Sequence, residues 1–352
     1  MKITLDGRHW RPSFHKYKAD APKRDFYQEI TDKVVAALER GVRPWQKSWT
    51  AKAGSVTPGL QLPLRFNGEP YSGVNVIVLW SEAATKGFSG ARWMTFKQAL
   101  DLGGAVRKGE KGSPVVYAGK IVKEEETASG EARDKVIGFL KGYTVFNTDQ
   151  IDNLPAQYYE ADDAGDLAEP VDPYTMAAAF FEAQRAKLVH GGNLPCFATN
   201  ASGFTDEIRM PYMAAFKTPG HYYSVLAHEF THWTGSHKRL ARNLNQRDKI
   251  VRAKEELIAE MGAAFLCAFL HIDDEPRKDH AAYLASWLKA LRDDKRYLFQ
   301  AASAAQKAVE FMKTRAGETD LADQINPDRS TALQPAPRAV AAADDRQAAF
   351  AL

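Results

Sequence analysis

The pentapeptide from His228 to His232, with the sequence HEFTH, is the feature that most constrains this chain. Residues four apart in a helix lie on one face, so both imidazoles can reach the same ion. Glu229 lies beside them and can take a proton from a water molecule at that ion. This arrangement is typical of catalytic zinc sites. It predicts hydrolytic chemistry, with one Zn²⁺ ion as the cofactor.

The surroundings of this motif favour a helix. Residues 221–227 contain no glycine or proline and place apolar side chains at helical spacing. Residues 219 and 220 (Pro-Gly) mark the predicted start, and Gly235 marks the predicted end, at a left-handed cap. Upstream, residues 206–211 are predicted to be a short strand that a proline stops, as at a sheet edge. An edge strand of this kind can hold an extended peptide.

A catalytic zinc site needs a third protein ligand. His237 follows His232 by five residues rather than the six of a metzincin, so its register is wrong. Three carboxylates, Glu255, Glu256 and Glu260, begin a long apolar helix in which buried acids need a partner. Any of the three can supply the ligand, and Glu256 is the first choice. The alternative is that these acids are solvated charges at the positive end of the helix.

Composition sets broad limits. A chain of 352 residues with 45% hydrophobic content can bury one or two cores, and its net charge of +3 does not by itself indicate a nucleic-acid partner. Two cysteines, Cys196 and Cys267, argue against a disulfide framework and for a reducing compartment. We find no signal-peptide pattern and no apolar run long enough to span a bilayer, so we expect a cytoplasmic protein.

The order of predicted elements is mixed α and β. Helices are expected at 25–40, 95–100 and 283–312, and strands at 115–122 and 136–147. Six acidic residues and no basic residue between positions 160 and 172 indicate a linker. We therefore expect five segments: a flexible arm at 1–22, a mixed α/β domain at 23–158, the linker at 159–172, a second domain at 173–313, and a disordered tail at 314–352.

A basic stretch suggests a nucleic-acid surface in the N-terminal half. Eight basic and two acidic residues lie between Lys86 and Lys123, with a glycine-broken loop at 107–112 and aromatic residues between the cations. Stacking faces beside cations suit single-stranded DNA. The alternative is a solvated basic face whose aromatic rings turn into the core. The candidate DNA-binding residues are Trp45, Lys47, Trp49, Arg92, Trp93, Lys97, Arg107, Lys108 and Lys111.

Several segments resemble one protein family. The segments 24–31, 41–49, 71–75, 93–99 and 104–112 are similar to the N-terminal domain shared by ArdC-type antirestriction proteins and TraC-type plasmid primases. The segments 228–235, 239–242 and 255–260 resemble the zincin-like metallopeptidase domain that follows it in ArdC-type proteins. The resemblance covers about residues 24–270 and keeps the order of the family.

This resemblance implies an α+β protein with two domains. The first would be a mixed α/β domain that binds single-stranded DNA. The second would be a gluzincin-type zincin domain with a small edge-stranded sheet and an active-site helix. By position in the gluzincin ExxxD element, Glu256 becomes the third ligand and Glu260 the group that orients a ligand histidine. Here the second acid is Glu rather than Asp.

The resemblance also implies a mobile-element function. A plasmid-encoded protein of this family helps incoming DNA escape restriction during conjugation, with single-stranded DNA and a DNA-associated protein or peptide substrate as partners. Three functions stay open. The zincin domain is an active zinc metallopeptidase with Glu229 as general base, or it is a structural part of a DNA-shielding protein, or the chain assists a primase. Candidate donors to the oxyanion are Tyr212, Tyr222 and His237.

Overall fold

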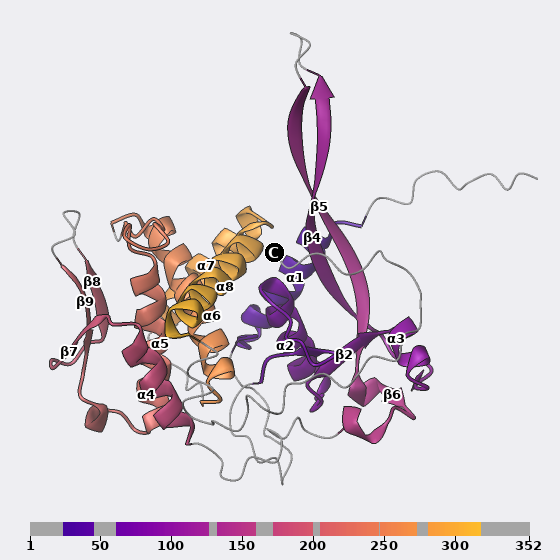
Figure 1. Ribbon diagram of the computed structural model, residues 1–352, viewed down its shortest axis with the longest axis horizontal. Coiled ribbons are helices and arrows are strands. Elements are labelled where there is room, and N and C mark those ends of the chain that lie inside the picture. The colour runs from indigo at the N-terminus through magenta and orange to yellow at the C-terminus, as the bar shows by residue number, and fades with distance from the viewer. Residues whose placement is uncertain are drawn as a thin grey trace, which may run out of the picture.

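The computed structural model combines helices with three small sheets (Figure 1), which confirms the predicted α+β class. It describes residues 24–45, 61–126, 132–159, 172–199, 205–245, 247–272 and 281–317, without the side chains of 120–126, 132–138 and 281–282. The predicted arm, Lys47, Trp49, most of the predicted linker and the tail beyond residue 317 lie outside these ranges.

The N-terminal region is built on a four-stranded sheet of order β1-β2-β5-β4. Three of its elements, α1, β4 and β5, agree closely with the helix and strands expected at 25–40, 115–122 and 136–147. The elements of this region are α1 (Phe26–Glu39), β1 (Leu64–Arg65), α2 (Val74–Lys86), β2 (Arg92–Thr95), α3 (Phe96–Asp101), β3 (Ala105–Val106), β4 (Ser113–Glu126), β5 (Ala132–Asn147), the 3₁₀ turns Thr148–Gln150 and Ala156–Tyr158, and β6 (Ile151–Asp152). Asp25 caps α1 by accepting from the Gln28 amide, and Gly87 ends α2 in the left-handed conformation.

Strands β4 and β5 form a long antiparallel hairpin that projects from the body (Figure 1). Its ladder runs from the pair Ser113 and Val145 at the base to the pair Glu126 and Ala132. At the base, Val115 and Val145 are buried in a cluster with residues of α2. The hairpin is therefore anchored at one end.

The second region places a small sheet beside a group of helices. Its elements are α4 (Pro173–Ala183), β7 (Lys187–His190), β8 (Cys196–Thr199), β9 (Asp206–Met210), the 3₁₀ turn Met213–Ala215, α5 (Pro219–Thr234), α6 (Lys249–Phe269), α7 (Ala281–Asp293) and α8 (Tyr297–Ala316). The single helix expected at 283–312 is in fact two, because the chain turns between Asp293 and Tyr297.

The prediction that residues 206–211 form an edge strand is wrong. Strand β9 lies in the middle of its sheet, parallel to β7 and antiparallel to β8, in the order β7-β9-β8. Pro211 follows the last strand residue, Met210, so it removes no hydrogen bond from either ladder. Among the described strands, β7 and β8 are the edges of this sheet.

Helices from the two ends of the chain pack around one core. Most buried apolar residues of α1 and α2 belong to the same hydrophobic cluster as those of α5, α6, α7 and α8. Trp45 meets Trp287 with 5.9 Å between ring centroids, and Trp80 of α2 meets Phe265 of α6 at 5.8 Å. The Thr31 hydroxyl also donates to the Lys295 carbonyl. The regions on either side of the predicted linker thus share apolar packing. None of the helices in the described ranges combines the length and hydropathy needed to cross a bilayer.

Candidate functional site

Helix α5 carries the HEFTH motif as predicted, and most of it is buried. The Thr218 side chain caps its start by accepting from the His221 amide. Gly235 follows the helix, but its φ is −74°, so the predicted left-handed cap is wrong. A Cβ on Gly235 would lie 2.8 Å from Arg242 Nη2 and 2.9 Å from Leu244 Cδ2. This glycine is needed for the close approach of the next segment rather than for its own backbone conformation.

Helix α6 packs closely against α5. Asp248 caps its start by accepting from the amides of Ile250 and Val251. Farther along, a Cβ on Gly262 would lie 2.5 Å from Thr231 Cγ2, so the two helices touch at a glycine. This contact brings the three glutamates in the middle of α6 opposite the histidines of α5.

Three side chains converge between these helices. The Nε2 atoms of His228 and His232 lie 3.1 Å apart. The Glu256 carboxylate faces both, with Oε2 3.5 Å from His228 Nε2 and Oε1 3.8 Å from His232 Nε2. One donor atom from each residue falls within 4.8 Å of the others. Two imidazoles and one carboxylate are the donor set of a catalytic zinc site, so these residues fit the metal that the motif implies.

Two further carboxylates lie at the other ring nitrogens. Glu255 Oε1 lies 3.2 Å from His232 Nδ1. Glu260 Oε1 lies 3.1 Å from His228 Nδ1, within ion-pair distance but without the alignment of a hydrogen bond. Carboxylates at this position fix the orientation of a ligand histidine and make its Nε2 a better donor. The structure therefore places Glu260 where the gluzincin pattern suggests and gives Glu255 the same place on the second histidine.

Arg242 completes this network, and the sequence analysis assigned it no role. Its Nη2 donates to Glu255 Oε1 at 2.7 Å and its Nε to Oε2 at 3.0 Å. The guanidinium also donates to the Thr231 carbonyl and the Thr234 hydroxyl, both at the end of α5. The one signal in the sequence was its presence in the family segment 239–242.

The charges of this centre are strongly coupled. Burial by itself raises the pKa of Glu255, but His232 and Arg242 outweigh it and hold the pKa below its usual range. Burial by itself lowers the pKa of His232, yet Glu255 and Glu256 together raise it to about 10. Each buried charge in this group thus depends on an opposite charge for its stability.

Glu229 is buried next to His228, and strand β8 lies on its side of the site. Burial, and then the charge of Glu229, raises the pKa of the Cys196 thiol at the start of β8. Among the oxyanion candidates, the Tyr222 hydroxyl lies 2.9 Å from His190 Nε2, Tyr212 stacks on the same imidazole from an exposed position, and His237 is exposed after α5. The sheet edge thus lies within electrostatic reach of the proposed general base.

Some of the predicted DNA-binding residues are buried and others face solvent. Trp45 is 0% exposed and Trp93 is 2% exposed, so neither ring is available for stacking on a base. For these two residues the alternative of core packing holds. Arg92 is half-buried, with its guanidinium over the Tyr158 ring. Four of the predicted DNA-binding residues face solvent: Lys97, Arg107, Lys108 and Lys111.

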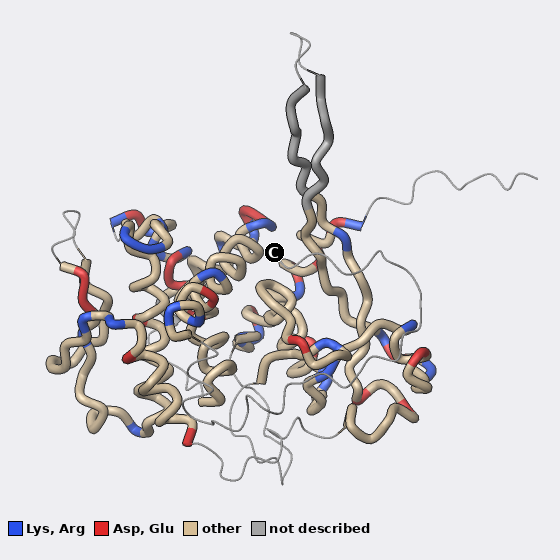
Figure 2. The backbone as a smooth tube through the Cα atoms, viewed as in Figure 1, with Lys and Arg blue, Asp and Glu red and all other residues tan. Residues whose placement is uncertain are grey.

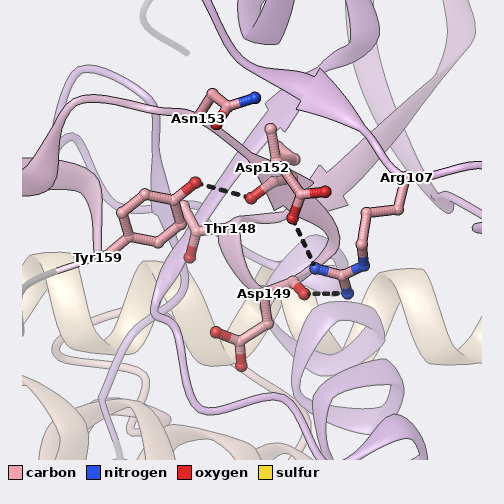
Figure 3. Close-up of a pocket in the computed structure, with 7 residues that line it drawn as sticks. Arg107, Thr148, Asp149, Asp152, Asn153 and Tyr159 are labelled. Atoms are coloured by element: carbon pink, nitrogen blue, oxygen red, sulfur yellow. Dashed lines mark hydrogen bonds and ion pairs between the residues drawn. The ribbon is translucent and has the colours of Figure 1, made fainter.

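Arg107 is occupied by internal contacts. It lines a surface pocket of about 520 Å³ together with Asp149, Asp152 and Tyr159 (Figure 3). Its guanidinium contacts the carboxylates of Asp152 and Glu110 at 3.4 and 3.0 Å and donates to the Asp149 carbonyl. Basic and acidic residues alternate at this end of the molecule (Figure 2). The pocket lining carries two carboxylates and one guanidinium, so it is poorly suited to a phosphate.

Two protein families match the chain in succession. Residues 24–146 match the N-terminal domain of anti-restriction factor ArdC, and residues 175–304 match a zincin-like metallopeptidase family, MPTase-PolyVal. Among solved structures, the metal-free antirestriction ArdC protein from plasmid R388 is 45% identical with a TM-score of 0.68, over 84% of this chain and 99% of that one. Its Mn(II)-bound structure is 44% identical with a TM-score of 0.67, over 83% and 98%.

Sequence relatives of known organisms also match most of this chain. The uncharacterized protein y4eC of Sinorhizobium fredii (strain NBRC 101917 / NGR234) is 33% identical over 82% of this chain and 91% of its own length. Two DNA primases TraC of Escherichia coli are 34% and 33% identical over 83% and 82% of this chain. The match spans only 20% and 27% of those primases. The donor set and the Mn(II)-bound relative together suggest a divalent metal ion at the α5–α6 centre.

Proposed function

Because this chain belongs to the ArdC family of antirestriction proteins, we propose that it binds single-stranded DNA and hydrolyses peptide bonds at a zinc centre. His228, His232 and Glu256 would hold the zinc ion, and Glu229 would act as general base. The protein would act in the cytoplasm, where it protects the incoming strand of a mobile element from restriction.

One observation carries the catalytic part of this proposal. The three donor atoms converge within 4.8 Å, and both histidines have a carboxylate at the opposite ring nitrogen. A structural zinc site is closed by four protein ligands, whereas three leave a position open for a substrate or water. The described residues supply three such ligands, which favours a catalytic site.

Each residue of the centre has a distinct task. A bound zinc ion would polarise the carbonyl of the scissile bond and make a water molecule more acidic. Glu229 accepts the proton of the attacking water and passes it to the leaving amine. Glu255 and Glu260 keep the two imidazoles oriented, and Arg242 holds Glu255 in place. Strand β8 pairs only with β9 among the described strands, so its other edge can hold an extended peptide.

Glu229→Gln tests this mechanism because it keeps the size of the side chain and removes the base. We expect peptide hydrolysis by the zinc-loaded protein to fall by about 10²- to 10⁴-fold, while metal content and DNA affinity stay unchanged. A peptide library with mass-spectrometric detection supplies the substrate. Full activity of the variant would overturn the role of Glu229. Absence of bound metal after zinc loading would overturn the centre itself.

A second function is favoured by the packing of α5 against α6. A metal ion held by both helices would join them within a core that also contains α1 and α2, and so would stabilise the whole molecule. In that case the protein shields DNA, and its zincin domain has a structural role. Antirestriction that persists in Glu229→Gln but is lost in His228→Ala would support this function over proteolysis. A role beside a primase ranks last, because the chain matches only a small part of those relatives.

A further inference from the structure

The outward face of the β4–β5 hairpin carries aromatic side chains. On β5, Phe139, Lys141 and Tyr143 alternate onto one face, and the ladder pairs Lys141 with Tyr117 of β4. Phe139 is 37% exposed and Tyr143 is 39% exposed. The rings of Tyr117 and Phe139 are in contact, at 6.1 Å between centroids, and Lys141 Nζ lies 5.1 Å from the centre of the Tyr143 ring. We call these four residues the aromatic stripe.

On the opposite face of the hairpin, three positions are packed, whereas Ala118 and Thr144 are exposed. Val116 belongs to the main core, and Leu140 packs against it. A Cβ on Gly142 would lie 1.9 Å from the Phe26 ring, so α1 rests directly on this face. On the stripe's own face, Val115 and Val145 at the base are buried in the cluster with α2, and the stripe begins beyond them. Antiparallel strands normally carry polar residues where they meet solvent, so three rings at half-buried or exposed positions depart from that rule.

The stripe also has a fixed shape. A Cβ on Gly119 would meet two atoms of the Phe139 ring at 2.4 and 2.6 Å and the Tyr117 ring at 3.0 Å. The Phe139 ring therefore lies against the backbone of the neighbouring strand at a glycine, and it is 37% exposed. An aromatic ring that covers a glycine in a strand also shields the backbone there from water, so the stability of the fold is an alternative reason for this contact. The experiments below separate the two.

We propose that the aromatic stripe is the surface on which single-stranded DNA stacks, a proposal that rests on the DNA-binding part of the proposed function. Unpaired bases stack on aromatic rings in any sequence, and a neighbouring cation contacts the phosphates. Lys141 stands between Phe139 and Tyr143, with about 6.8 Å between successive side chains on this face of the strand. At the described positions of this face there is no carboxylate to repel a polyanion.

This chemistry distinguishes the stripe from the basic loop at 107–112. Arg107 there is neutralised by Asp152 and Glu110, and the hydroxyl of the exposed Tyr159 beside it is bonded to Ile151 and Leu154. Bases in a duplex already stack on each other, so their faces cannot reach the rings. The stripe is therefore selective for single strands over duplex.

The first test replaces the rings in the full-length protein. Binding of a fluorescent oligo-dT is measured by anisotropy for wild type, for Phe139→Ala with Tyr143→Ala, and for the matched swap Phe139→Tyr with Tyr143→Phe. We expect about ten-fold weaker binding for each ring lost, because one stacked base is worth 1–3 kcal/mol. The swap keeps both stacking faces and should bind like wild type. Tyr212→Ala, an exposed tyrosine in the other region, is the control for nonspecific effects.

The second test separates stacking from charge. An abasic oligonucleotide of the same length keeps the phosphates and lacks the bases, so the double alanine variant should bind it as well as wild type does. Lys141→Gln should reduce the slope of log affinity against log salt by about 0.7 for one lost phosphate contact. If the alanine variant loses affinity equally for both oligonucleotides, or if the swap binds as weakly as the alanine variant, the rings do not act by stacking and the proposal fails.

The remaining outcomes distinguish this inference from the function on which it rests. If wild type does not bind oligo-dT, the DNA-binding part of the proposed function fails first. If wild type binds and the double alanine variant binds equally well, only the stripe assignment fails. If the variant keeps its DNA affinity but changes from dimer to monomer in light scattering, the stripe is instead an interface between two copies of the chain.

Discussion

The α5–α6 centre and the β4–β5 hairpin differ in how far their functional side chains are buried and how much they depend on partner charges. In the centre, the imidazoles and carboxylates are largely buried, and each depends on an opposite charge: His232 on Glu255, and Glu255 on Arg242. On the hairpin, Phe139 and Tyr143 are 37% and 39% exposed, and each ring contacts a neighbouring ring or a lysine. Electrostatic contacts are strong where water is excluded, and an unpaired group is costly there. Single substitutions should therefore have large effects in the centre and moderate, additive effects on the hairpin.

The largest effect is expected from His232→Ala, which removes a donor from the centre. Metal affinity should fall by more than the roughly 100-fold that loss of an outer carboxylate costs. Zinc titration against a competing chelator measures it. His190→Ala is the matched control, because that imidazole is exposed on β7 and outside the donor cluster. Equal zinc affinity in the two variants would show that the centre is not a metal site.

The next effect concerns the ion pair of Arg242 with Glu255. Arg242→Ala leaves Glu255 buried with one partner fewer, so we expect a loss of about 3–5 kcal/mol in the free energy of unfolding of the metal-free protein. Lys289→Ala breaks an exposed pair with Asp293 and should cost less than about 1 kcal/mol. Urea unfolding gives both values. Similar costs for the two variants would contradict the contrast between buried and exposed charge. Arg242→Lys should recover part of the loss, since lysine keeps the charge without the fork of donors.

Substitutions at two glycines test the difference between the two faces of the hairpin, with smaller expected effects on stability. Gly142→Ala pushes a Cβ into the Phe26 ring on the packed face, so we expect a loss of about 1–3 kcal/mol in stability. Gly119→Ala meets the Phe139 ring on the open face, where the ring can swing into solvent. It should change stability little and weaken single-stranded DNA binding instead. If Gly119→Ala is the more destabilising of the two, the open face is a structural surface.

The smallest effect depends on pH. Asp206 of β9 pairs with Arg239, and this hydrogen bond holds the pKa of the Asp206 carboxyl below its usual value of 3.8. The stabilisation is therefore present above about pH 4 and disappears as the pH falls through the lowered value. Asp206→Asn should cost about 1 kcal/mol or less at pH 7, with no difference from wild type in strong acid. A difference that stays constant across unfolding curves from pH 7 to pH 2 would exclude a charge effect.

Features set by residues close together in the sequence could be predicted, whereas features set by contacts between distant residues could not. The His228–His232 spacing is a property of one helix turn, and the helix that contains it is confirmed. The edge assignment of residues 206–211 was wrong because strand order depends on β7 and β8, whose pairing no local pattern revealed. Trp45 and Trp93 could not be placed from residue type alone, since an aromatic ring beside cations occurs both in cores and on surfaces. Arg242 reaches Glu255 across a turn, and only the folded chain shows that contact.

The shared core also has a consequence for how the protein is made. Trp45 packs on Trp287, 242 positions later in the chain (287 − 45). At about 5–20 residues per second, a ribosome needs roughly 12–50 s to pass from the first tryptophan to the second. During that time α1 has no α7 to cover it, and its apolar face stays open to water or to a chaperone. The N-terminal region therefore reaches its final packing only after α7 has been made, when α5 and α6 have already emerged.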